Sequence, residues 1–287
     1  MEDLKRMEDL KRTCIPQFDR RHSNFTHRAN CLINEINTCI EVYAAPQCLD
    51  LCNTVYNKLP RELRDMIYGY ILDDQYMVVD EKVIASPIYR NMTAEDDFPA
   101  GYREPMWDRY IHVFYSSYTG PKFKAELVEA WYQATTFIFT DCRLVGFFLE
   151  KDRWGYGIDV RQSIRKVEIA RRLDRFLCDS FLGRSCDTDL VNDLDSLHGL
   201  RKGARITFAF ETHFFRSTLS GIQWNNVAAA MQRVSVMFTA IDMLLENGYK
   251  VLVKFDYLAA FEAEKEELTV KSWISKARGL VGGGRQA

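Results

Sequence analysis

Apolar residues recur at helical spacing over residues 59–72, and they form the most regular pattern in the first part of the chain. The apolar side chains fall on one broad face of a predicted helix: Leu59, Leu63, Met66, Ile67, Tyr70 and Ile71. Pro60 suits the first helical turn, where its missing N–H is not needed, and Glu62 suits the positive end of the helix. The pattern therefore predicts an amphipathic helix with one apolar stripe.

Residues 73–121 lose this regularity. A short apolar run at 76–79 is followed by scattered prolines and by an acidic cluster at 95–97. Prolines and clustered polar residues favour loops over packed elements. We expect this segment to be a loop-rich insertion rather than part of the core.

From Phe123 onward, helical and strand-like patterns alternate. The predicted helices are 125–134, 143–151, 188–197 and 225–246, and the predicted strands are 135–140, 164–170, 204–210 and 250–255. Asn247-Gly248 matches a left-handed helix cap. Because parallel neighbours need a long crossover, the alternation predicts an α/β fold with a largely parallel sheet and crossover helices. The unequal strand intervals favour an irregular sheet like that of leucine-rich repeats.

Both ends of the chain are polar or glycine-rich. The hexapeptide at 1–6 recurs unchanged at 7–12, and glycines occupy 282–284. We interpret the first segment as a frayed terminal helix, with a partner-binding arm as the alternative, and the second as a flexible tail. The predicted organisation is a polar, cysteine-containing region (1–54), the helix with its insertion (55–122), the α/β domain (123–278) and the tail (279–287).

Composition is that of a folded protein. Of the 287 residues, 47% are hydrophobic and 27% are charged, so apolar burial can offset the entropy of ordering. The net charge of −2 gives no overall field that would attract nucleic acid or an anionic membrane, and we expect neither as a partner. Gln232, Arg233 and Asp242 interrupt the longest apolar helical stretch, so no membrane span is expected. Without an apolar signal-peptide core at its start, the chain is expected to be cytoplasmic or nuclear.

The eight cysteines are interpreted as reduced thiols in such a compartment. Cys48 and Cys52 have a separation that a zinc site uses, with His22 and His27 nearby. The remaining amino-terminal cysteines are irregularly spaced and do not complete two close ligand pairs. We therefore expect no metal and no cofactor, with a zinc site as the alternative.

The segment LPRELRDMIYGYIL at 59–72 resembles the opening helix of an F-box, and more closely that of the fungal F-box-like proteins of unknown function. Later segments resemble the same group in their order: an aromatic stretch at 129–132, a Thr-Phe strand at 136–139 and an Ile-Arg strand at 164–169. The resemblance implies that the helix binds the small adaptor of cullin-RING ubiquitin ligases, while the downstream domain recruits a protein substrate. The implied adaptor contacts are Leu59, Pro60, Leu63, Ile67 and Ile71.

The chain departs from the F-box pattern after this helix, because an irregular segment follows where two further helices are usual. The same apolar stripe would also serve as a core-packing face, which would bury it inside the chain. Exposure of Leu63 and Ile67 distinguishes these two readings.

No known catalytic motif is present, and we expect no enzyme activity. Weaker candidates for chemistry are the pair Asp108 and His112, the separate residues His198 and His213, and the cysteines Cys142 and Cys178. A basic cluster carries six cations, interpreted as a charged strand edge with binding of an acidic partner or of RNA phosphates as the alternatives: Arg161, Arg165, Lys166, Arg171, Arg172 and Arg175.

The function expected from the sequence is a non-catalytic protein-interaction module, acting as a substrate receptor of a ubiquitin ligase for an unknown protein substrate. The alternatives are a stand-alone scaffold with no ligase coupling and an enzyme with an unrecognised site.

Overall fold

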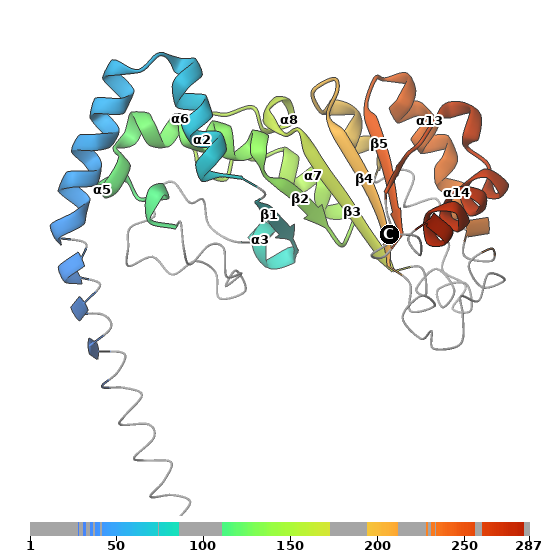
Figure 1. Cartoon of the computed structure of the whole chain (residues 1–287), viewed down its shortest axis with the longest axis horizontal. Helices are drawn as coiled ribbons and strands as arrows, with labels where there is room; N and C mark the ends of the chain where they lie inside the picture. The colour runs from blue at the N-terminus through green and yellow to red at the C-terminus, as the bar shows by residue number, and fades with distance from the viewer. Residues whose placement is uncertain are drawn as a thin grey trace, which may run out of the picture.

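A computed structural model of the chain describes residues 28, 31–32, 35–36, 38–40, 42–73, 75–85, 111–172, 194–211, 228, 231–232, 234–255 and 260–283. The described positions between 28 and 58 are helical, and we call this segment the amino-terminal helix. It is followed by α2 (Arg61–Ile71), and the two form a helical hairpin at one end of the molecule (Figure 1).

The centre of the molecule is a six-stranded sheet whose strands lie in chain order. The strands are β1 (Tyr76–Val79), β2 (Thr136–Phe139), β3 (Lys166–Arg172), β4 (Arg205–Glu211), β5 (Lys250–Phe255) and β6 (Phe261–Glu262). All neighbours pair in parallel except β5 and β6, which are antiparallel. The α/β class and the largely parallel sheet are thus confirmed.

Helices lie between the strands and after the last of them. They are α3 (Glu81–Ala85), η2 (Ile111–Phe114), α5 (Ser116–Thr119), α6 (Pro121–Ala134), α7 (Arg143–Leu149), α8 (Val160–Ser163), η4 (Asp195–Gly199), η5 (Ser235–Met237), α13 (Phe238–Glu246), η6 (Lys265–Glu267) and α14 (Val270–Gly283). Crossovers between parallel strands are nearly always right-handed. Since β1 to β5 follow one another in one direction across the sheet, right-handed crossovers place their helices on the same face.

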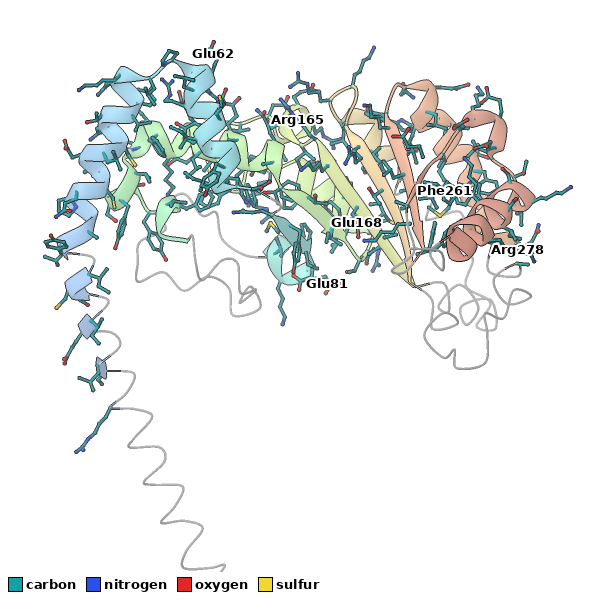
Figure 2. All side chains as sticks on the ribbon, in the orientation of Figure 1. Glu62, Glu81, Arg165, Glu168, Phe261 and Arg278 are labelled. Atoms are coloured by element: carbon teal, nitrogen blue, oxygen red, sulfur yellow. The ribbon has the colours of Figure 1, made fainter. Side chains whose placement is uncertain are left out.

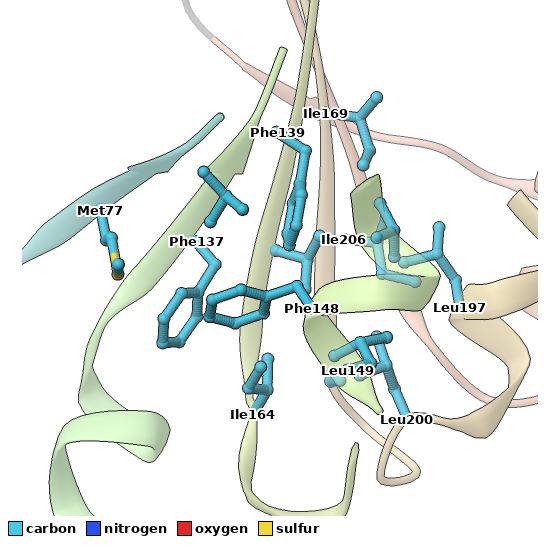
Figure 3. Close-up of a cluster of buried hydrophobic side chains, with 14 of the residues drawn as sticks. Met77, Phe137, Phe139, Phe148, Leu149, Ile164, Ile169, Leu197, Leu200 and Ile206 are labelled. Atoms are coloured by element: carbon cyan, nitrogen blue, oxygen red, sulfur yellow. The ribbon is translucent and has the colours of Figure 1, made fainter. Parts of the chain in front are cut away.

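Burial along the strands agrees with this one-sided arrangement. Phe137 and Phe139 in β2 are fully buried, whereas Thr136 and Ile138, which alternate with them along the strand, are only half-buried. Figure 3 shows the buried side of the sheet, where Phe148 of α7 lies beside these phenylalanines, with ring centroids 5.1 and 5.6 Å apart. The core therefore lies between the sheet and its helices.

The segment expected to be a loop-rich insertion contributes a strand to the sheet, so that interpretation is wrong for residues 76–79. Met77 and Val79 are buried, and β1 pairs in parallel with β2. A strand of four residues has only two side chains that point into the core, and two positions are too few to show a clear period in the sequence. Residues 86–110 of this segment lie outside the described residues.

Other boundaries also differ from the prediction. The helix expected at 188–197 is represented by the 3₁₀ helix η4, and that expected at 225–246 ends as η5 followed by α13. Gly248 has a φ of 82°, as its predicted cap requires. Helix α14 continues to Gly283, into the segment expected to be a tail, whereas the duplicated hexapeptide lies outside the described residues.

The interpretation of the basic cluster as a strand edge is wrong. Strand β3, which contains Lys166, pairs with β2 on one side and with β4 on the other. A strand in the middle of a sheet has no free edge for charge to protect. The cations on β3 therefore need another explanation.

Candidate functional site: the outward face of helix α2

Helix α2 is held to the rest of the molecule by charged and polar groups. Arg64 donates two hydrogen bonds of 2.8 Å to the Glu126 carboxylate of α6, and Tyr68 donates one of 2.9 Å to the same carboxylate. Arg61 adds an ion pair with Glu126 at 3.4 Å. We call these four residues the Glu126 network.

The network also fixes the end of the amino-terminal helix. The Nη1 atom of Arg64 donates to the backbone carbonyls of Tyr56 and Leu59, at 3.1 and 2.6 Å. The guanidinium lies 4.7 Å from the centre of the Tyr56 ring, within range of a cation–π contact. One arginine therefore joins the amino-terminal helix, α2 and α6.

The network shifts the titration of its members. Burial alone would raise the pKa of the Glu126 carboxyl, but hydrogen bonds from Arg64 and Tyr68 and the charge of Arg61 lower it below its usual value. Burial, followed by the Glu126 carboxylate, raises the pKa of Tyr68. At neutral pH the carboxylate is therefore ionised and the phenol keeps the proton that it donates.

Large apolar side chains point away from this network. Leu63 is 46% exposed, Met66 is 71% exposed and Tyr70 is 88% exposed. These three residues, spaced three and four apart on one side of the helix, are called the α2 outward face. A helix on a protein surface normally turns its apolar stripe inward and its charges to solvent, whereas α2 turns Arg64 inward and leaves these three apolar side chains exposed, although Tyr68 and Leu72 toward its end are buried.

The five implied adaptor contacts are distributed around this face. Leu63 and Pro60 are exposed, while Leu59, Ile67 and Ile71 are half-buried. Ile71 packs against the core, together with the fully buried Tyr68 and Leu72. The structure thus places Leu63 outward with Met66 and Tyr70, two residues that the resemblance did not single out although their helical spacing does.

A second exposed apolar stripe lies on the amino-terminal helix, in the region that the sequence indicated only as polar. Its members are at least half exposed: Leu32, Ile36, Ile40, Tyr43 and Leu51. The opposite side of this helix contacts the body, where Ala45 is buried and Cys48, Cys52 and Tyr56 are partly buried. The spacing of 32, 36, 40 and 43 is the helical signal that would have revealed this stripe.

Gly69 provides a test of the helical backbone beside the outward face. A Cβ atom built at Gly69 meets nothing within 4 Å, and the residue is exposed. We expect Gly69→Ala to raise the free energy of unfolding by about 0.5 to 1 kcal/mol, because alanine loses less entropy in a helix. Chemical denaturation measures this change. Gly120→Ala is the contrasting variant, since Gly120 has a φ of 72° and its Cβ would lie 3.1 Å from Leu49. A loss of stability in Gly69→Ala would contradict the unobstructed helical backbone assigned to Gly69.

The zinc alternative receives little support from the thiols. Burial, with a further contribution from Cys48, raises the pKa of Cys52 to about 11, so that thiol stays protonated at neutral pH, whereas zinc binds thiolate. Among the described residues, no three His, Cys, Asp or Glu side chains form a group that could hold a metal ion.

Two of the weaker chemical candidates lie within the described residues. His198 lies in η4 with its Nε2 atom 3.9 Å from Asp195, and Cys142 is buried just after β2. Asp108, His213 and Cys178 lie outside the described residues, as does the side chain of His112.

Compared with family models, with curated proteins and with solved structures, the chain shows no match. Within the described part of the chain, no helix is both long enough and apolar enough to cross a membrane.

Proposed function

We propose that the chain is a non-catalytic protein-interaction module whose α2 outward face binds the small adaptor of cullin-RING ubiquitin ligases. The observation that carries the proposal is the exposure of three large apolar side chains on α2. Arg64 is held inward by Glu126, while Leu63, Met66 and Tyr70 stand in solvent. Neighbouring large apolar side chains on a rigid surface are typical of protein interfaces.

The energetics of such an interface are favourable. Burying a leucine or methionine side chain contributes about 1.5 to 3 kcal/mol, so a few anchors can support a helix-to-helix contact. The Glu126 network holds α2 in one orientation before binding, which reduces the entropy lost on association. The F-box-like sequence at 59–72 is the reason for choosing the ligase adaptor as the partner.

We assign the sheet to substrate recruitment. Strands in chain order with crossover helices on one face are also the arrangement of leucine-rich repeats, whose open surface binds other proteins. In this proposal the F-box-like hairpin and the leucine-rich-repeat-like sheet divide the two tasks of a ligase substrate receptor.

Charge introduced at two of the implied adaptor contacts, Leu63 and Ile67, tests the adaptor interface. In a pull-down with the purified adaptor, Leu63→Asp combined with Ile67→Asp should reduce the retained protein at least roughly 10-fold, because two carboxylates would be desolvated at the interface. Tyr70→Asp should act in the same direction without disturbing packing, since that side chain is 88% exposed.

The matched control is Phe147→Asp in α7, because Phe147 is 61% exposed but belongs to a different surface. It should leave adaptor retention unchanged. Circular dichroism and a thermal melt verify that each variant is folded. Retention of the wild type and the α2 variants to the same extent, or of neither, would sink the proposal.

The exposed stripe of the amino-terminal helix favours a second candidate, a stand-alone scaffold without ligase coupling. A scaffold would use Leu32, Ile36 and Ile40 for its partner and would not require α2. Failure of the wild type to bind the adaptor, together with a change of oligomeric state on Ile36→Asp measured by light scattering, would favour this candidate.

A further inference from the structure

The face of the sheet opposite the crossover helices carries a row of three cations. Lys166, Arg205 and Lys250 begin β3, β4 and β5, and strand pairing places them directly beside one another. Neighbouring strands lie about 4.8 Å apart. Their side chains point away from the core, because the next residues, Val167, Ile206 and Val251, are buried.

The turns before these strands add three more cations to the same end of the sheet. Arg165 precedes β3, and Arg201 and Lys202 precede β4; all three are exposed. Backbone hydrogen bonds join the turns, from the Arg205 N–H to the Arg165 carbonyl at 2.7 Å and from the Lys250 N–H to the Ala204 carbonyl at 3.0 Å. Figure 2 shows Arg165 at this end and Glu168 farther along β3. We call the six residues the basic row: Arg165, Lys166, Arg201, Lys202, Arg205 and Lys250.

Within the described part of the chain, no carboxylate neutralises these charges. In the described ranges, none of the six side chains forms an ion pair. Like charges directly opposite one another on neighbouring strands destabilise a sheet. Proteins keep such unfavourable local arrangements mainly at functional sites. The row is also rigid, because it lies on central paired strands.

We infer that the basic row binds an acidic segment of a protein partner. The inference rests on the proposed function only in assigning substrate recruitment to the sheet. The row supplies the charge complementarity that carboxylates need. Two residues farther along the strands, the same face carries Ile138, Thr207 and Leu252, all half-buried. These side chains suit contact with apolar and small side chains of a peptide.

Nucleic acid fits this face less well. Binding of single strands uses aromatic side chains on which bases stack, and the described outward positions of β3, β4 and β5 hold none. Glu168 lies on the same face two residues beyond Lys166, and Glu262 lies beside Leu252. These two carboxylates would repel a phosphate backbone, whereas a peptide of mixed charge can avoid or pair with them.

Fluorescence anisotropy with the full chain tests the inference. The probe is a labelled 15-residue peptide of glutamate, leucine and serine, compared with the peptide in which lysine replaces glutamate. The wild type should bind the acidic peptide, and Lys166→Gln, Arg205→Gln, Lys250→Gln combined should weaken binding at least roughly 10-fold. The lysine peptide should not bind, and added salt should weaken the acidic complex.

The matched control removes three other exposed charges with the same change in net charge: Lys58→Gln, Lys151→Gln and Lys271→Gln. It should retain binding of the acidic peptide. Equal loss in both triple variants, no binding of the acidic peptide by the wild type, or tighter binding of a single-stranded oligonucleotide of the same charge would each overturn the inference. The test is separate from the adaptor test, because the basic-row variant should still bind the adaptor and the α2 variants should still bind the peptide.

Discussion

Replacing Glu126 with glutamine is expected to lower the free energy of unfolding by about 2 to 3 kcal/mol, because it leaves the buried ends of Arg64 and Tyr68 without their shared carboxylate. The Glu126 side chain is 14% exposed, so water replaces little of the lost interaction. Denaturant titration at neutral pH measures the change. The same variant should weaken adaptor binding, since α2 would lose its fixed orientation.

Glu129→Gln is the matched control. Glu129 lies one helical turn from Glu126, but its side chain is 41% exposed, and among the described residues it bonds only to Arg61 and Gln133. A surface pair of this kind contributes about 0 to 1 kcal/mol. Equal effects of the two glutamine variants would contradict the role assigned to Glu126.

The Glu126 effect should also depend on pH in one direction. The pKa of Glu126 is lower in the folded protein than in the unfolded chain, so the carboxylate stabilises the fold at neutral pH. This contribution is lost as the pH falls through the folded-state pKa. The difference between the wild type and Glu126→Gln should therefore shrink in acid.

Replacing Lys124 with methionine is expected to raise the free energy of unfolding by about 2 kcal/mol near pH 7. Lys124 lies in α6 and is fully buried; its Nζ atom is 3.5 Å from the Ser116 hydroxyl and 5.6 Å from the Trp154 ring centre. Burial lowers the pKa of this amine to about 8, from the usual 10.5. Methionine has a similar shape and no charge to desolvate.

The advantage of methionine should fall as the pH rises. Between about pH 8 and 10 the unfolded chain binds a proton at Lys124 that the folded protein has released, so the wild type gains stability. The gap between the two proteins should shrink by about 2 kcal/mol between pH 7 and pH 9.5. The raised pKa of Cys52 has the opposite effect, because it makes the fold less stable as the pH rises. This effect is the same in both proteins and cancels when they are compared at the same pH.

Lys122→Met is the matched control on the same helix. Lys122 is exposed, and its contact with the Tyr56 ring spans 5.9 Å, so its replacement should change stability by less than about 0.5 kcal/mol at either pH. A gap between Lys124→Met and the wild type that stays constant with pH would contradict the burial of a titrating amine at this position.

The sheet was predictable where its strands are long and flanked by helices. The runs at 164–170, 204–210 and 250–255 are rich in β-branched and aromatic residues, and each became a strand within two residues of the prediction. Strand β1 was missed because its four residues stand beside scattered prolines and an acidic cluster, whereas the equally short β2 is flanked by predicted helices on both sides. Register is a tertiary property, so the alignment of Lys166 with Arg205 and Lys250 was not visible in the sequence.

The candidate site was also predictable only in part. Periodicity correctly placed a helix at 59–72 with an apolar stripe, but periodicity does not say which side of a helix meets the body. That choice depends on Glu126, which lies 62 positions after Arg64 in the chain. The stripe on the amino-terminal helix was missed because asparagines, cysteines and two glutamates lie between its members in the sequence.

The order of the strands has a consequence for how the protein is made. Each strand from β2 to β5 pairs with the strand that precedes it in the chain, so each new strand finds its partner already synthesised. During synthesis, β2 can dock on β1 and β3 on β2 as each leaves the ribosome, and the helical hairpin is finished before the sheet begins to grow.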